Sequence, residues 1–68
     1  MNIKSSDVKC TQIEYSSSNP IYKGYHVLTN AADSDPYWWI IKYTYSGSDI
    51  IKIQEAEGKW DNRATLGW

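Results

Sequence analysis

The residue types that most often carry out catalysis are scarce in this 68-residue chain. Nucleophilic catalysis needs a Ser, Cys or Thr beside a base, and the chain has one histidine, His26, and one cysteine, Cys10. One thiol and one imidazole do not define a catalytic dyad. We therefore interpret them as a free thiol and a half-buried strand histidine, and the sequence predicts no enzyme and no catalytic residues.

Metal and phosphate sites are equally poorly supported. Asp33 and Asp35 have the spacing that begins a calcium loop, but its glycine and its distal bidentate glutamate are missing. We assign these two carboxylates to turn formation and solvation. The four glycines stand alone along the chain, so there is no glycine-rich phosphate cradle. One Cys and one His do not make a zinc set, and we expect no metal and no cofactor.

Aromatic residues are the one excess. The chain has four Trp, six Tyr and no Phe, so every large ring carries a polar atom. Such rings suit positions half in and half out of water, as at subunit interfaces and ligand platforms. About half of them are expected to fill the core, because so small a domain has few other large apolar groups.

Three uses compete for the remaining rings. The first is a subunit interface in an assembly. The second is a sugar- or peptide-binding platform on which Trp38, Trp39 or Tyr43 stacks a ligand. The third is a single-strand nucleic-acid fold with rings alternating with basic residues. It is the weakest, because Lys42 and Lys52 are the only basic residues of the central hairpin and the net charge is −1.

The elements that must position these residues predict an all-β fold, a small antiparallel meander or sandwich of three or four strands. Residues 11–15 alternate between polar and apolar side chains, which predicts a short strand, and the Ser-rich stretch through Pro20 ends it. Residues 21–28 form a second strand, in which Gly24 indicates a bulge or a close backbone approach. The strongest signal is a central β-hairpin at 37–55, whose two halves are rich in β-branched and aromatic residues.

The first strand of this hairpin is apolar on both faces at its start. One face carries Trp39, Ile41, Tyr43 and Tyr45, and the other carries Trp38, Ile40, Lys42 and Thr44. A lone small antiparallel sheet normally keeps one face wet. The Trp38/Ile40 face is therefore predicted to be buried, under the earlier strands or another chain. A bulge near Ile41 would transfer Tyr43 to this face.

The chain length allows one domain, which we place at 11–68, with residues 1–10 as an arm or weak strand. A short C-terminal helical turn follows the hairpin, capped by Asp61 or Asn62 and ended by Gly67. Arg63 is then free to reach Glu55, Glu57 or a neighbouring subunit. With a single cysteine, stability must come from packing or from partner subunits.

Charge and hydropathy exclude several classes of partner. Seven basic residues stand against eight acidic ones, and no block of like charge marks a nucleic-acid or membrane-binding surface. The longest apolar and aromatic run, 37–41, is far too short to span a bilayer, and the N-terminus has no apolar signal segment. These features favour a reducing cytoplasm, with no nucleic acid and no membrane as partner.

The last two thirds of the chain contain a series of short motifs. They are Ile21-Tyr22-Lys23-Gly24-Tyr25, Asn30-Ala31-Ala32-Asp33-Ser34, Trp38-Trp39-Ile40-Ile41-Lys42-Tyr43-Thr44-Tyr45, Ile51-Lys52-Ile53-Gln54-Glu55-Ala56-Glu57-Gly58 and Trp60-Asp61-Asn62-Arg63-Ala64-Thr65-Leu66-Gly67-Trp68. This series resembles a family of short proteins and protein C-termini encoded among the virion genes of tailed bacteriophages. The terminal Trp-Asp-Asn-Arg is its most specific part. Departures are Glu57 in place of Asp, a shorter connection before Trp60, and Trp68 in place of Tyr.

The resemblance implies a phage structural protein of the head-tail or tail region, located in the virion and made in the bacterial host cytoplasm. Its partners would be other virion proteins or copies of itself. The candidate interface residues are Trp60, Asp61, Arg63, Leu66, Trp68, Trp39 and Tyr43, and Trp60, Leu66 and Trp68 would form an apolar latch in a groove on an adjacent protein. The alternatives are a carbohydrate- or peptide-binding β-module and a phage-encoded inhibitor of a host protein.

Overall fold

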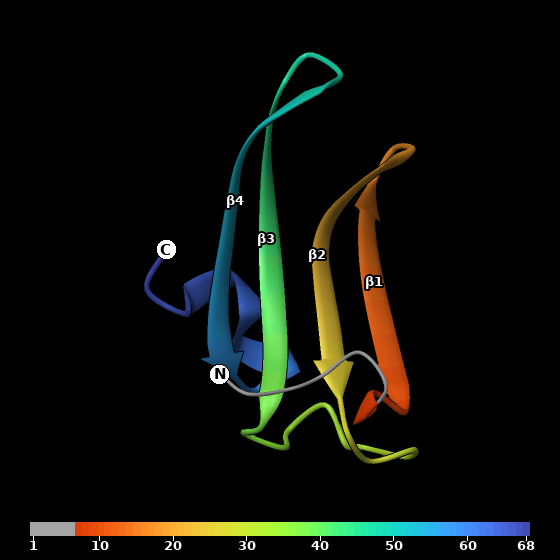
Figure 1. Cartoon of the computed structure of the whole chain (residues 1–68). Coiled ribbons are helices and arrows are strands. Elements are labelled where there is room, and N and C mark those ends of the chain that lie inside the picture. Colours follow the sequence, from red (N-terminus) through yellow and green to blue (C-terminus); the bar gives the residue numbers. More distant parts are fainter. Residues whose placement is uncertain (1–6) are drawn as a thin grey trace.

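The computed structural model describes residues 7–68 as one antiparallel sheet followed by a short 3₁₀ helix (Figure 1). The strands are β1 (Cys10–Ser16), β2 (Asn19–His26), β3 (Trp38–Ser46) and β4 (Asp49–Gly58), and the helix is η2 (Trp60–Thr65). Spatial order follows chain order, so the sheet is a meander. The predicted all-β meander with a central hairpin and a C-terminal turn is confirmed. The first six residues of the expected N-terminal arm lie outside the described part.

The strand boundaries differ from the predicted ones at the turns. The first hairpin reverses over Ser17 and Ser18, Ser17 has a φ of 58°, and Pro20 already belongs to β2. Proline is tolerated there because the β1–β2 register shifts beside its partner Tyr15. In the central hairpin the register irregularity lies between Thr44 and Tyr45, so the predicted bulge near residue 41 is wrong.

The two hairpins are joined over a short distance. Strand β2 pairs with β3 only from Tyr22 opposite Lys42 to Tyr25 opposite Trp39. Beyond these pairs the strands diverge toward the hairpin tips, which stand apart at the top of Figure 1. The Tyr45 hydroxyl bridges the diverging ends by donating a hydrogen bond to the Pro20 carbonyl at 2.7 Å.

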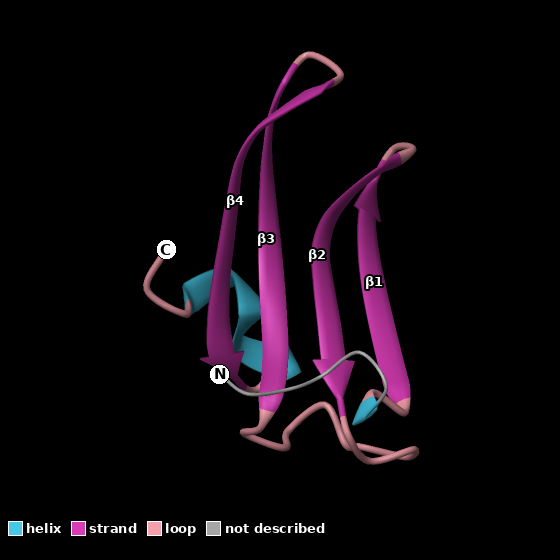
Figure 2. Ribbon diagram, in the orientation of Figure 1, coloured by secondary structure: helices cyan, strands magenta, loops and turns pink. Residues whose placement is uncertain are grey.

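The core lies on the side of the sheet that η2 covers. Trp38 and Ile40 are completely buried, which confirms their predicted placement. Their cover comes from the C-terminal segment of the same chain, because Trp60 of η2 lies over them with 5% of its surface exposed. Figure 2 shows η2 on one side of the single layer of strands. The expected cover, earlier strands or another chain, is therefore corrected.

The helix packs closely because β2 has a glycine where Trp60 lies. A Cβ atom at Gly24 would lie 2.6 Å from Cε3 and Cζ3 of Trp60 and 3.1 Å from Cε3 of Trp38. The two indoles themselves have centroids 6.0 Å apart. Gly24 thus makes the close approach predicted from the sequence, and the backbone of β2 forms part of the floor on which Trp60 rests.

Replacing Ile40 with alanine tests the core assignment. The substitution removes a fully buried side chain, so we expect a loss of about 2–5 kcal/mol of unfolding free energy, enough to unfold so small a domain. Ile50→Ala is the matched control, because Ile50 is 48% exposed, and it should cost at most about 1 kcal/mol. Thermal melts that showed equal losses would contradict the assignment.

A double-mutant cycle tests the contact between Gly24 and Trp60. Gly24→Ala forces the new methyl group against the indole, and we expect it to cost about 1–3 kcal/mol. Trp60→Phe removes Cε3 and Cζ3, so the same glycine substitution should cost less in that background. Urea denaturation of the four proteins measures this coupling. Strictly additive losses would show that the two positions do not interact.

Candidate functional site

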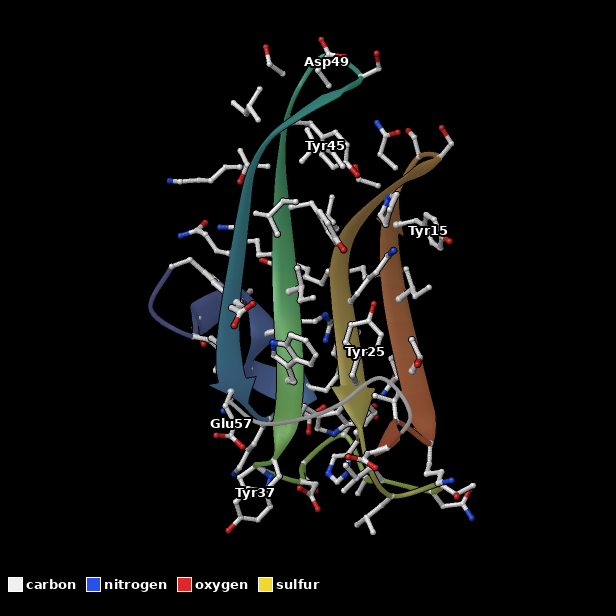
Figure 3. The ribbon with its side chains drawn as sticks, viewed as in Figure 1. Tyr15, Tyr25, Tyr37, Tyr45, Asp49 and Glu57 are labelled. Atoms are coloured by element: carbon white, nitrogen blue, oxygen red, sulfur yellow. The ribbon has the colours of Figure 1, made fainter. Side chains whose placement is uncertain are left out.

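The face of the sheet opposite η2 is apolar, and no described helix or strand covers it. We call it the open face; its large apolar residues are Ile13, Tyr25, Trp39, Ile41, Tyr43 and Ile53. Strand alternation and the cross-strand partners place them on one side. In Figure 3 this side faces the viewer, with Tyr25 in front and η2 behind the sheet.

Aromatic and branched side chains form the centre of the open face. The rings of Tyr25 and Trp39 lie 5.5 Å apart. Together with Val8, Thr11 and Ile41 they line a shallow hollow of about 440 Å³. Toward the edges the apolar side chains are more accessible, with Ile13 42% and Ile53 62% exposed. Apolar patches at protein surfaces occur at protein or membrane interaction sites and in ligand-binding grooves.

Charges on the open face are few and are segregated by strand. Lys23 of β2 lies near the middle, with its Nζ 5.5 Å from the centre of the Tyr43 ring. Glu55 and Glu57 project from β4, at the edge of the sheet. Among the residues of the four strands, the face therefore carries Lys23 close to its centre and Glu55 and Glu57 along one border.

The predicted interface residues divide between the two sides of the sheet. Trp39 and Tyr43 lie on the open face. Trp60, Leu66 and Trp68 pack on the covered side, within or against the core of their own chain. The expectation that these three residues form a latch in a groove on an adjacent protein is therefore corrected, because their groove is on their own sheet.

The tail is fixed by side chains far away in sequence. The rings of Tyr22 and Trp68 lie 6.2 Å apart, and Trp68 Nε1 donates to the Arg63 carbonyl at 2.6 Å. A Cβ at Gly58 would lie 2.6 Å from a methyl carbon of Leu66, so this residue also fits against bare backbone. Gly67, with a φ of 87°, follows the helix as predicted.

Arg63 has a different partner from the one expected. Its Nε donates to Glu14 Oε1 of β1 at 2.7 Å, and its guanidinium lies 4.7 Å from the centre of the Trp60 ring. The predicted pairing with Glu55 or Glu57 is wrong, because these two side chains point to the open face, away from η2.

The start of η2 is held by the loop between β2 and β3. Lys59 is the N-cap residue and makes no side-chain cap, so the predicted cap by Asp61 or Asn62 is wrong. Instead, the Asp61 backbone N–H donates to the Asp33 carbonyl at 3.1 Å. The Asp33 carboxylate in turn accepts a 2.6 Å hydrogen bond from Gln12 of β1. This loop therefore connects β1 to the helix.

His26 also has a structural role. It is 2% exposed, deeper than the half-buried position expected, and its ring packs edge-on against Trp38 at 5.1 Å. Nδ1 accepts from the Leu28 backbone N–H at 3.1 Å, which leaves the proton on Nε2 for Asp35 Oδ1 at 3.0 Å. Cys10 is the cross-strand partner of His26, but both ring nitrogens are already engaged.

Comparisons with known proteins add no relative, since no family model, curated protein or solved structure matches the chain. Within residues 7–68, no group of three or more His, Cys, Asp or Glu side chains is arranged to hold a metal ion. Over the same residues no helix has the length and apolar character needed to cross a bilayer.

The Asp35 carboxylate makes the unfolding free energy depend on pH in the acid range. The hydrogen bond from His26, and then that from the Tyr37 backbone N–H, lower the pKa of Asp35 below its ordinary 3.8. The resulting stability is fully present above pH 3.8 and is lost as the pH falls toward the lower pKa of the folded state, because the unfolded chain binds the proton first.

The variant Asp35→Asn is expected to lose this part of the pH dependence, since the amide keeps an accepting oxygen but does not titrate. Thermal melts of wild type and variant between about pH 5 and pH 2 provide the measurement. The stability difference in favour of wild type should shrink on acidification. A difference that stays constant over this range would show that the Asp35 contacts do not contribute.

Proposed function

We propose that the chain is a non-enzymatic structural subunit or adaptor of a tailed-bacteriophage particle, which assembles through the open face. The observation that carries this proposal is a sheet whose core lies on one side and whose other side, within residues 7–68, is an aromatic face that no helix or strand covers. The resemblance of residues 22–68 to phage virion proteins supplies the biological setting. Its partners are other virion proteins or copies of itself, and it is made in the host cytoplasm.

The open face is unfavourable in an isolated chain because it leaves apolar surface in contact with water. Burying apolar surface stabilises an assembly by about 25 cal/mol per Å², and interfaces of stable complexes are enriched in Tyr, Trp and Met at their centres. Tyr25, Trp39 and Tyr43 occupy the middle of this face, with branched residues around them. The described part of the chain leaves these rings half-buried, so association is an event that would complete their burial.

A cleft at the hairpin tips favours the carbohydrate- or peptide-binding alternative. Where β2 and β3 diverge, Asn19, Tyr22, Tyr43 and Tyr45 line an open cleft of about 500 Å³. Tyrosine rings beside an amide and a lysine are suitable for stacking and hydrogen bonding a sugar or peptide. Trp38, one of the rings first considered for such stacking, is completely buried and is excluded from this role.

Incorporation into particles tests the proposed function. We expect the wild-type chain in purified phage particles by mass spectrometry, and at least about a tenfold loss of incorporation for Ile41→Lys, which places a charge at the centre of the open face. Leu28→Lys is the matched control and should be incorporated normally, because Leu28 is 55% exposed and lies in the loop after β2, outside the strands. Circular dichroism establishes that both variants are folded.

The opposite results identify the alternatives. A chain that is absent from particles overturns the proposal. Binding of a glycan or peptide, with NMR shift changes confined to the tip cleft around Tyr43 and Tyr45, would favour the second function.

A further inference from the structure

The open face has a charge pattern that is complementary to that of a second, rotated copy of the same face. We propose that it is closed by the same face of a second copy of this chain, which forms a β-sandwich dimer with η2 on each outer side. This inference deepens the proposed function by naming the partner of the assembly surface. It rests on that function only in assigning assembly to the open face.

The face is large enough for a specific dimer. Four strands of 7 to 10 residues, spaced about 4.8 Å apart, cover on the order of 500 Å² before side-chain relief is counted. Two such faces bury at least about 1,000 Å², the size at which specific interfaces begin. Stacked antiparallel sheets pack about 10 Å apart with nearly aligned strands, and the part of the face where all four strands lie side by side is centred on the rows of β2–β3 pairs.

One edge of the sheet is poorly suited to assembly. Strand β4, at this border, carries Asp49, Lys52, Glu55 and Glu57. Charged side chains on an edge strand disfavour pairing with another strand. Extension of the sheet at the β4 edge is therefore disfavoured.

The charges select how the two faces meet. A two-fold axis parallel to the strands places β4 of one copy over β1 of the other, and β3 over β2, while each residue keeps its level along the strands. Ile13, Lys23, Ile41 and Glu55 form one cross-strand row. Glu55 of the second copy then lies over Ile13, which is the neighbour of Lys23 in this row. Lys23 and the second copy's Glu55 are therefore offset sideways by one strand spacing, and symmetry provides this pair twice.

The other simple arrangement is unfavourable. A two-fold axis in the interface but perpendicular to the strands places β4 over β4 with the strand direction reversed, and when it passes through the row of Tyr25, Trp39 and Glu57 it places the Glu57 carboxylates of the two copies opposite each other. Like charges facing each other across an interface cost several kcal/mol. The strand-parallel axis avoids this repulsion.

The same rotation pairs aromatic rings at the centre. Tyr25 and Trp39 belong to one row, on β2 and β3. With β3 over β2, Trp39 of each copy lies over Tyr25 of the other. Aromatic pairs across a desolvated centre are the contacts that dominate interface energetics, and the Lys23 to Glu55 pairs then fix the orientation.

A charge-reversal series on the full chain tests the proposal, with sedimentation equilibrium over a concentration series as the measurement. We expect wild type to dimerise. Lys23→Glu and Glu55→Lys should each raise the dimer dissociation constant at least about tenfold, because each places like charges opposite one another. The double variant restores opposite charges and should return to within about threefold of wild type. Lys52→Glu, which points to the other side of β4, is the matched control.

Three results would overturn the dimer. The first is a wild-type chain that stays monomeric up to about millimolar concentration. The second is a dimer that both single variants and the double variant retain. The third is a double variant whose dimer dissociation constant is no lower than that of the single variants. If Lys23→Glu does not fold, Glu55→Lys, at an exposed edge position, decides alone. A chain incorporated into particles but monomeric in solution rejects the dimer and leaves the proposed function standing. A chain that forms the charge-dependent dimer but is absent from particles supports the dimer and rejects the proposed function.

Discussion

The contact between the Trp60 indole and the bare backbone at Gly24 is the constraint on which the rest of the structure depends. Because no side chain occupies that position of β2, the indole packs directly against the sheet and covers Trp38 and Ile40. This single placement decides which side of the sheet becomes the core. It also determines that Trp39 and Tyr43, neighbours of the core residues along β3, face the opposite way and stay half-buried, outside the core.

The helix that carries Trp60 is short, and distant parts of the chain hold it in place. Arg63 reaches Glu14 on the far strand, and Asp61 donates to the Asp33 carbonyl in the loop after β2. Each of these is a modest interaction in itself. Together they tie η2 to β1 and to the β2–β3 loop, so the short helix does not need a strong propensity of its own.

The sequence predicted the features that depend on neighbouring residues. The central hairpin was predictable because β-branched and aromatic runs on either side of a Gly-containing turn specify it locally, and Gly24 was identified as a point of close approach. Alternation also grouped Trp39 with Ile41 and Tyr43. Alternation also predicted that the Trp38/Ile40 face is buried, but it does not reveal what covers that face, because the cover is Trp60, more than 20 residues along the chain.

The same limit explains the errors in the tail. Trp60, Leu66 and Trp68 have the composition of an interface, and composition does not distinguish a partner's groove from the chain's own sheet. The Arg63 partner was sought among nearby carboxylates and is Glu14, 49 residues away. The buried pairing of His26 with Asp35 was missed for a related reason, because an unremarkable loop folds back to place the carboxylate.

The brief ladder between β2 and β3 has a consequence for the motions of the molecule. Only four residue pairs join the two hairpins, and they lie at the end of the sheet that the helix and the loop brace. The hairpin tips, linked by the Tyr45 hydroxyl, lack that bracing. Regions with few contacts open at a lower free energy than the core, so local opening of the hairpin tips is expected to require less free energy than opening of the braced base.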